Sequence, residues 1–404
     1  MWSHIDIVLS HPLHTNTLSR AHLLGLRANP ITLAVHVEDQ PSREHPDEGG
    51  DGLAHFFSSY SERTESLELR CFYNKSEYRQ PIRTFFSMAR KGVLKRLVLI
   101  DKSADCNACS FFAPTNSGPS ITNSAIGEYT LHELDTTLQE YEDLMLPLTG
   151  LKLSALYPYW TSQAYRGLIE LQLIPGRDAG FGNMGTNAII SDVQLVDMLR
   201  ASPELRVFHF GLSIQTLSES TPRPAYMKDL EVFRLEYMHT DEQQTVLGLI
   251  NPSQKPLHMI WGTQTHFGPL PLNLPSQSLF TKFFLSSHIT RLSIKGMMSE
   301  FCFFQLLPLL PQLQYLALSQ FIINIAGELE GYEPNFRGVL RRLHLLRCEI
   351  YLGSLQLLVE TISIERITSS YCQYDYEDLS SVNSLVEHVD SEGGFGEGGW
   401  DELL

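Results

Sequence analysis

The most informative segment of the chain reads Leu340-Arg341-Arg342-Leu343-His344-Leu345-Leu346-Arg347-Cys348. Its apolar residues follow a simple order: apolar, two residues, apolar, one residue, apolar. Leu343 and Leu345 share one face of an extended strand, because side chains alternate along a strand. One short strand cannot bury that face alone, but a parallel stack of such strands makes a continuous core.

The same spacing recurs along the chain. Clear copies begin at Leu94, Leu148, Leu168, Leu205, Leu230, Ile289, Leu313 and Leu340, and weaker ones at Leu67, Leu257 and Ile364. Most intervals after residue 148 lie near the roughly 20–29 residues of leucine-rich repeats. Between the strands, helical spacing and caps predict helices over 81–90, 131–145, 191–199, 240–249 and 299–307. The pattern predicts an α/β leucine-rich-repeat solenoid (a horseshoe), with parallel strands on the concave face and helices on the convex face.

Charge and composition divide the chain into three parts. We expect an N-terminal capping segment over 1–60 with an acidic loop at 38–51, a solenoid over 61–374, and an acidic, glycine-rich, flexible tail over 375–404. Of the net charge of −16, the tail contributes −9 and the loop −5, which leaves −2 for the rest. An insertion near 100–147 is interpreted as a loop.

Several classes of protein are excluded at this stage. The acidic balance argues against a general nucleic-acid binder, which needs a basic surface to neutralise phosphates. No run of about 18 apolar residues predicts a membrane span, and the first residues lack the features of a secretory signal. Six scattered cysteines do not make a disulfide framework, so we expect a reduced, intracellular protein of the cytoplasm or nucleus.

Motifs for chemistry are weak. The glycines of 180–185 match a dinucleotide fingerprint, but the next predicted helix begins near Ser191 instead of on the third glycine. Cys106 and Cys109 have no second pair that would complete a zinc site. No nucleophile elbow, P-loop or metalloprotease motif occurs. We therefore expect no cofactor, no metal, no catalytic residue and no enzymatic activity.

The strand register predicts which side chains point away from the core. Arginine and large aromatic residues dominate the energetics of protein interfaces, and we expect such residues to form one surface on neighbouring strands. The partner-binding candidates are Arg234, Trp261, Arg291, Lys295, Tyr315, Arg342, His344 and Arg366. The surface is expected to bind a protein segment with acidic or phosphorylated residues. An ordinary solvated face, or one covered by the acidic tail, is the alternative.

Four segments resemble a known family. Residues 2–7 and 9–13 are similar to the stretch that follows the F-box in fungal F-box/leucine-rich-repeat proteins, and residues 28–37 and 157–162 also fit. The resemblance covers about residues 1–375. The F-box itself would lie upstream of Trp2.

In that family the F-box docks on the Skp-family adaptor of a cullin ubiquitin ligase, while the repeats hold the substrate. The resemblance therefore implies the substrate-recognition part of such a receptor, with a Skp-family adaptor as partner only if an F-box exists upstream. The alternative is a standalone scaffold or inhibitor on the same solenoid, with no link to a ubiquitin ligase.

Overall fold

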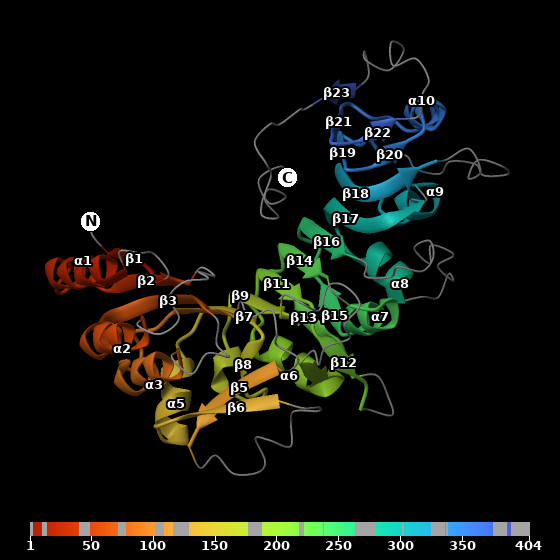
Figure 1. The fold of residues 1–404 in the computed structure, drawn as a ribbon. Helices are drawn as coiled ribbons and strands as arrows, with labels where there is room; N and C mark the ends of the chain where they lie inside the picture. The colour runs from red at the N-terminus through yellow and green to blue at the C-terminus, as the bar shows by residue number, and fades with distance from the viewer. Residues whose placement is uncertain are drawn as a thin grey trace. The chain divides into compact units, whose positions relative to one another are not determined.

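A computed structural model describes most of the 404-residue chain (Figure 1). The described residues are 3–9, 14–39, 49–71, 78–101, 109–115, 129–176, 188–217, 222–236, 238–262, 279–300, 303–324, 336, 338–374 and 386–388. The chain divides into two compact units, unit 1 (Met1–Ala225) and unit 2 (Tyr226–Leu404). Each unit is built on a parallel sheet with helices, so the predicted α/β class is confirmed.

The sheet of unit 1 has an unbroken parallel order. Its strands, in spatial order, are β1 (His4–Val8), β2 (Leu33–Glu38), β3 (Thr64–Cys71), β4 (Arg96–Asp101), β7 (Gly150–Ser154), β9 (Glu170–Ile174) and β11 (Val207–Phe210). Its helices are α1 (His14–Arg27), α2 (Gly49–Tyr60), α3 (Arg79–Met88), α5 (Leu138–Met145) and α6 (Asp192–Ala201), with short 3-10 turns at Ser61–Arg63 and Gln163–Tyr165. Helical crossovers are expected, because parallel neighbours cannot be joined by a tight turn.

A second layer of short strands lies in unit 1. The parallel strands β5 (Cys109–Pro114), β6 (Tyr129–Leu134) and β8 (Leu156–Pro158) form one small sheet, and β10 (Ile189–Ser191) pairs with β12 (Ser213–Gln215). This layer corrects two predictions. Part of the insertion at 100–147 is strand rather than loop, and the helix predicted over 131–145 is replaced by β6 followed by α5. The apolar spacing fits a helix, but pairing with β5 stabilises the extended form of its first residues.

An aromatic cluster fills the space between the helices and this second layer. Successive ring centroids lie 5.3 Å apart from Phe57 to Phe85, 5.4 Å from Phe85 to Phe86 and 5.3 Å from Phe86 to Phe112. All four rings are buried. Large aromatic surfaces of this kind supply much of the burial energy of a core, so α2, α3 and β5 are held together by packing.

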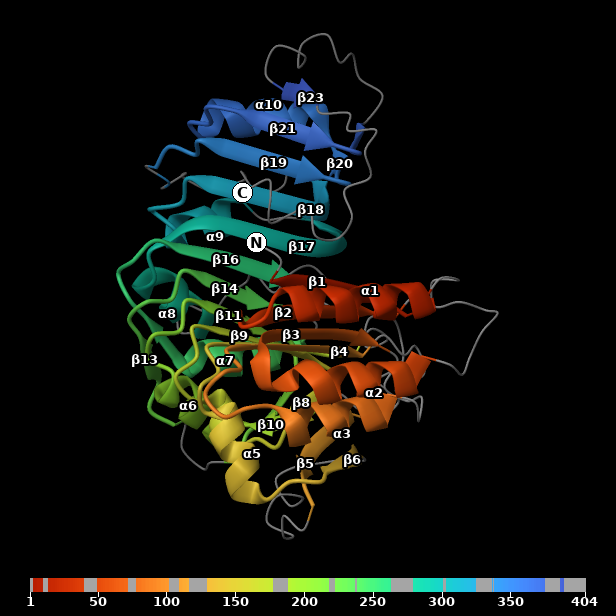
Figure 2. The same ribbon diagram turned by 90° about the vertical axis from the view of Figure 1, so that its left-hand side faces the viewer.

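Unit 2 repeats the same plan. Its sheet strands, in spatial order, are β14 (Val232–Leu235), β16 (Leu257–Gly262), β17 (Ile289–Glu300), β18 (Tyr315–Ile323), β19 (Arg342–Leu346), β21 (Ile367–Ser370) and β23 (Val386–His388). Its helices are α7 (Thr240–Gly248), α8 (Leu279–Ser286), α9 (Phe303–Leu306) and α10 (Leu352–Thr361), with a 3-10 turn at Leu307–Leu309. Figure 2 shows β16 to β21 side by side and running in one direction.

Sharp corners occur within β18, at Gln320, and just after β19 and β21, at Arg347 and Tyr371. Gln320, Arg347 and Tyr371 adopt positive φ angles of 61°, 52° and 55°, which is uncommon for residues other than glycine. After these corners the chain continues into a second row of short pairings, in which β20 (Glu349–Ile350) contacts β18 and β22 (Gln373–Tyr374). The strands β13 (Ala225–Met227) and β15 (Ile250–Pro252) form a further pair.

The predicted apolar ladder is confirmed inside each unit. The ladder residues Leu69, Leu99, Leu153, Leu171, Phe208, Phe233, Leu292, Leu316, Leu343 and Leu345 are all at most 2 % exposed. Cys348 and Cys372 follow the corners, and their thiols lie 3.4–3.6 Å from backbone carbonyl oxygens there. Both cysteines are free. The two thiols therefore help to satisfy the backbone at these turns.

Two of the helix predictions are confirmed at their first residues. Ser191 caps α6 in a reciprocal capping box with Gln194, and α7 begins at Thr240. The helix predicted from residue 299 instead begins at Phe303, because β17 continues through Glu300 and pairs with β18 there.

Some predictions concern residues that the structure does not describe. The glycines of 180–185, Cys106, residues 40–48 of the acidic loop, and the tail apart from β23 lie outside the described residues. None of the helices in the described part of the chain combines the length and the apolar character needed to cross a bilayer.

Candidate partner-binding surface

The predicted partner-binding residues all belong to unit 2, on or beside its sheet. Pairing places Arg291 of β17 opposite Tyr315 of β18, and Tyr315 opposite Arg342 of β19. These three residues, called the cationic row below, are each half-buried. The structure therefore brings together, in one line across three strands, residues that lie up to 51 positions apart in the sequence.

One contact stabilises the cationic row internally. The guanidinium carbon of Arg291 lies 5.0 Å from the centroid of the Tyr315 ring. A guanidinium over an aromatic face is attracted by the ring quadrupole, and its planar fork matches carboxylate and phosphate groups. The stacked arginine is thus oriented before any partner arrives.

The neighbouring positions on this face are small. Ser293, Ala317 and Thr368 lie between the longer side chains and are buried. Lys295 is exposed two residues beyond Ser293. The face therefore has buried small side chains at its base, called the floor below, and more exposed Arg and Lys side chains beside them.

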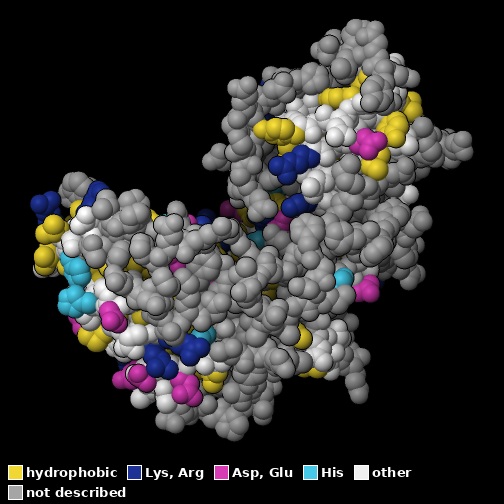
Figure 3. Space-filling view, viewed as in Figure 1, with side chains coloured by type: hydrophobic (Ala, Val, Ile, Leu, Met, Phe, Trp, Pro, Cys, Tyr) yellow, Lys and Arg dark blue, Asp and Glu magenta, His cyan; other side chains and the backbone are white. Residues whose placement is uncertain are grey.

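The charged side chains that the structure describes on three strands of this face are basic. The described side chains of β17, β18 and β19 include Arg291, Lys295 and Arg342, and they include no aspartate or glutamate. Figure 3 shows Lys and Arg side chains gathered over this part of unit 2. Arg234 on β14 forms an ion pair in which its Nε lies 2.5 Å from the Glu236 carboxylate.

His344 is placed less favourably than expected. It lies on this face of β19, but it is 6 % exposed, and its Nδ1 is 2.7 Å from the Thr368 hydroxyl. Burial, and secondarily the charge of Arg342, lower the pKa of His344. The neutral imidazole is therefore part of the floor instead of a protruding contact residue. Arg366, by contrast, is exposed beside β21.

The structure corrects the placement of Trp261. The indole is 1 % exposed, its ring centroid lies 5.0 Å from that of Phe280, and its Nε1 donates a 2.6 Å hydrogen bond to Gln243. The weak copy that begins at Leu257 predicts Ile260 as its next core residue, but the core residues of β16 are Leu257, Met259 and Trp261. A shift of one residue exchanges the two faces of a strand, so Trp261 belongs to the core.

The sheet face of unit 1 carries charge of both signs. Glu68 on β3 lies 2.5 Å from Arg70 Nε, 3.5 Å from Arg96 Nη1 and 3.7 Å from His36 Nε2. His36 in turn contacts the Asp6 carboxylate at 3.2 Å. Burial raises the pKa of Glu68, but the Arg70 hydrogen bond and the charges of Arg70, His36 and Arg96 together bring the pKa below its usual value. Charge on this face is satisfied within the unit.

Sequence reasoning missed another group of residues in unit 1. Arg79, Arg83 and His132 line a small cavity between α3 and the second layer. The two arginines are four positions apart in a helical segment, which was the one signal present in the sequence. Among the described residues, no group of three or more His, Cys, Asp or Glu side chains is arranged to hold a metal ion.

The chain was also compared with known proteins. No protein-family model matches it, and no curated protein matches its sequence.

Proposed function

We propose that the chain is a leucine-rich-repeat solenoid that acts as a non-catalytic protein-binding module. The partner is held on the sheet face of unit 2. Support for the repeat assignment comes from the recurring strand and helix units and from the buried ladder. The observation that carries the binding proposal is the cationic row, Arg291–Tyr315–Arg342, with Arg291 stacked on the tyrosine ring.

The chemistry of this row favours an acidic or phosphorylated partner segment. Guanidinium groups bind carboxylate and phosphate in a bidentate manner, and such charge-assisted hydrogen bonds are the strong ones. Arg291 and Arg342 are two strand spacings apart, or roughly 10 Å at about 4.8 Å each. One turn of a polyproline II helix, three residues at about 3.1 Å each, spans roughly 9 Å and brings side chains i and i+3 to the same face. A peptide that crosses the strands can therefore place acidic side chains at positions i and i+3 against the two arginines.

The test uses synthetic peptides and the full chain. One peptide carries glutamates three positions apart, a second carries phosphoserine at both positions, and a third carries glutamine. We expect Arg291→Ala and Arg342→Ala each to weaken binding of the acidic peptides by about tenfold, since hydrogen bonds to charged groups contribute about 1.5–3 kcal/mol. Fluorescence anisotropy measures the affinity.

Arg341→Ala provides the matched control, because Arg341 is exposed beside Arg342 but lies outside the cationic row. Its affinity should equal that of the unsubstituted chain. Added salt should weaken binding of the acidic peptides, because exposed charges are screened. Equal binding of the acidic and glutamine peptides, or equal loss in Arg341→Ala and Arg342→Ala, would overturn the proposal.

We further propose that this module is the substrate-recognition part of an F-box-type ubiquitin ligase receptor inside the cell. The support is the resemblance of the four segments, together with two neighbouring cysteines that remain free. The test is binding of a purified Skp-family adaptor to the longest product of the gene. A complex that also holds the acidic peptide supports the ligase role, whereas peptide binding without adaptor binding favours a standalone scaffold or inhibitor.

A further inference from the structure

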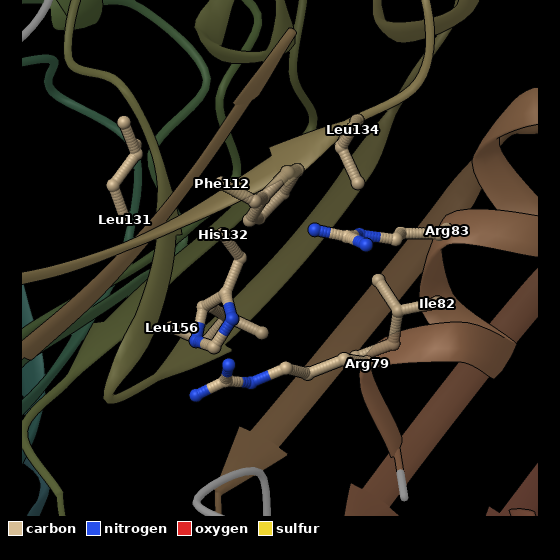
Figure 4. Close-up of a pocket in the computed structure, with 8 residues that line it drawn as sticks. All are labelled: Arg79, Ile82, Arg83, Phe112, Leu131, His132, Leu134 and Leu156. Carbon is tan, nitrogen blue, oxygen red and sulfur yellow. The ribbon is translucent and has the colours of Figure 1, made fainter. Parts of the chain in front are cut away.

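A small cavity in unit 1 has an unusual lining. It encloses about 40 Å³ between α3 and the strands of the β5–β6–β8 layer. Its polar side chains are Arg79, Arg83 and His132, and the other lining residues are apolar, among them Phe112 and Leu156. Figure 4 shows both arginine side chains reaching from α3 toward the strands that carry Phe112 and His132.

The helix itself directs the two arginines into this space. Arg79, Ile82 and Arg83 occupy positions i, i+3 and i+4 of α3, which share one face of a helix. The Nε of Arg83 donates a 2.9 Å hydrogen bond to the backbone carbonyl of Glu133, so this guanidinium is held at a defined place beside β6. Its terminal nitrogens remain as donors.

His132 is the third polar residue that lines the cavity, and the lining residues include no aspartate or glutamate. Burial, followed by the charge of Arg79, lowers the pKa of His132; Arg83 acts in the same direction and Asp101 opposes it. Asp101 is buried and is not among the lining residues. The cavity thus combines the hydrogen-bonded Arg83, the exposed Arg79, one imidazole and apolar walls, an arrangement in which an anion is the complementary ligand.

We propose that this cavity is a binding site for a phosphoryl group, carried either by free phosphate or by a phosphorylated side chain. A phosphoryl group on a side chain offers three terminal oxygens and free phosphate offers four, enough for two guanidinium groups and one imidazole N–H, whereas a carboxylate offers two. Arginine forks match phosphate oxygens in a bidentate manner. Arg83 and His132 are half-buried beside the apolar walls, which strengthens their attraction for an anion, since charges interact more strongly away from water. This site belongs to unit 1 and does not depend on the proposed partner surface of unit 2.

The test titrates the full chain with inorganic phosphate, with phosphoserine and with acetate, and follows the His132 imidazole by NMR. Bound phosphate should raise the pKa of His132, because a nearby negative charge favours the protonated ring. We expect Arg79→Gln to weaken phosphate binding by about tenfold or more, since a charge-assisted contact is lost. Arg90→Gln is the matched control, because Arg90 is exposed just beyond α3 and does not line the cavity.

The relative affinities distinguish a phosphorylated side chain from free phosphate as the ligand. Tighter binding of phosphoserine supports a phosphorylated side chain, and equal or tighter binding of phosphate supports the free anion. The proposal is overturned if phosphate leaves the His132 signals unchanged, if acetate binds as well as phosphate, or if Arg79→Gln and Arg90→Gln lose affinity equally. His132→Gln gives a second variant, read by calorimetry, if Arg79→Gln does not fold.

Discussion

The described charged residues differ between the sheet face of unit 1 and strands β17 to β19 of unit 2. In unit 1, Glu68 is surrounded by Arg70, Arg96 and His36, so positive and negative groups neutralise one another on the surface. In unit 2, β17 to β19 carry arginine and lysine, without an acid among their described side chains. Both faces stand on the same kind of buried ladder. The ladder therefore specifies the fold, while the outward positions are free to become either a self-satisfied surface or a surface that suits an acidic partner.

The largest expected effect is a loss of stability that differs between the buried side and the outward side of β19. Leu343 is fully buried, and Leu343→Ala should destabilise unit 2 by about 2–5 kcal/mol, because it removes buried apolar surface and leaves a cavity. Arg342→Ala, on the other side of β19, should cost less than about 0.5 kcal/mol, as surface substitutions usually do. Native-state hydrogen exchange of the β19 amides measures both values. Equal losses would mean that the cationic row is part of the structural core.

A smaller loss of stability is expected on the sheet face of unit 1, where Glu68 forms ion pairs. Glu68→Gln should destabilise unit 1 by about 1 kcal/mol, because it leaves Arg70 and Arg96 beside a neutral side chain; both arginines are partly exposed, so screening limits the cost. Hydrogen exchange of β3 amides at neutral pH measures this loss. Gln172→Ala, on the same face of β9, is the control and should change little. A loss no larger than that of the control would remove the distinction between the faces.

The same carboxylate predicts a pH dependence. The pKa of Glu68 is lower in the folded chain than its usual value. Its contribution is therefore present above about pH 4.5, the unfolded value, and is lost as the pH falls through the lower folded pKa. Unfolding of the unsubstituted chain should show this acid-dependent loss, and Glu68→Gln should show less of it. Identical pH profiles for the two proteins would contradict the assignment.

The smallest expected effect tests the electrostatics of the unit 2 face. The charge of Arg342 contributes to the lowered pKa of His344, after burial. Arg342→Gln should raise that pKa by less than about one unit, because burial remains. NMR titration of the His344 ring measures the shift, and Arg341→Gln should leave it unchanged. A lower pKa in Arg342→Gln would contradict the like-charge arrangement.

Strands and core were more predictable than the surface built on them. The spacing of apolar residues identified β4, β7, β9, β11, β14, β17, β18 and β19, because burial of one strand face leaves a period of two in the sequence. The same rule misplaced Trp261, since the weak copy that begins at Leu257 put Ile260 on the inner face, one residue out of register. It also predicted a helix over residues 131–134. Their extended form is stabilised by pairing with β5, whose residues lie 20 positions earlier in the chain, so the local pattern does not show it.

Local alternation of side chains was enough to establish the repeating unit, the buried ladder and the list of outward arginines. Tertiary structure alone settled which of those side chains meet. Arg291 stacks on Tyr315 because two strands pair in a particular register, and His132 joins Arg79 and Arg83 because a separate small sheet packs beside α3. The period of a strand is visible in its own residues. The register in which it pairs with another strand is set by contacts between residues far apart in the sequence, so it appears only in the folded chain.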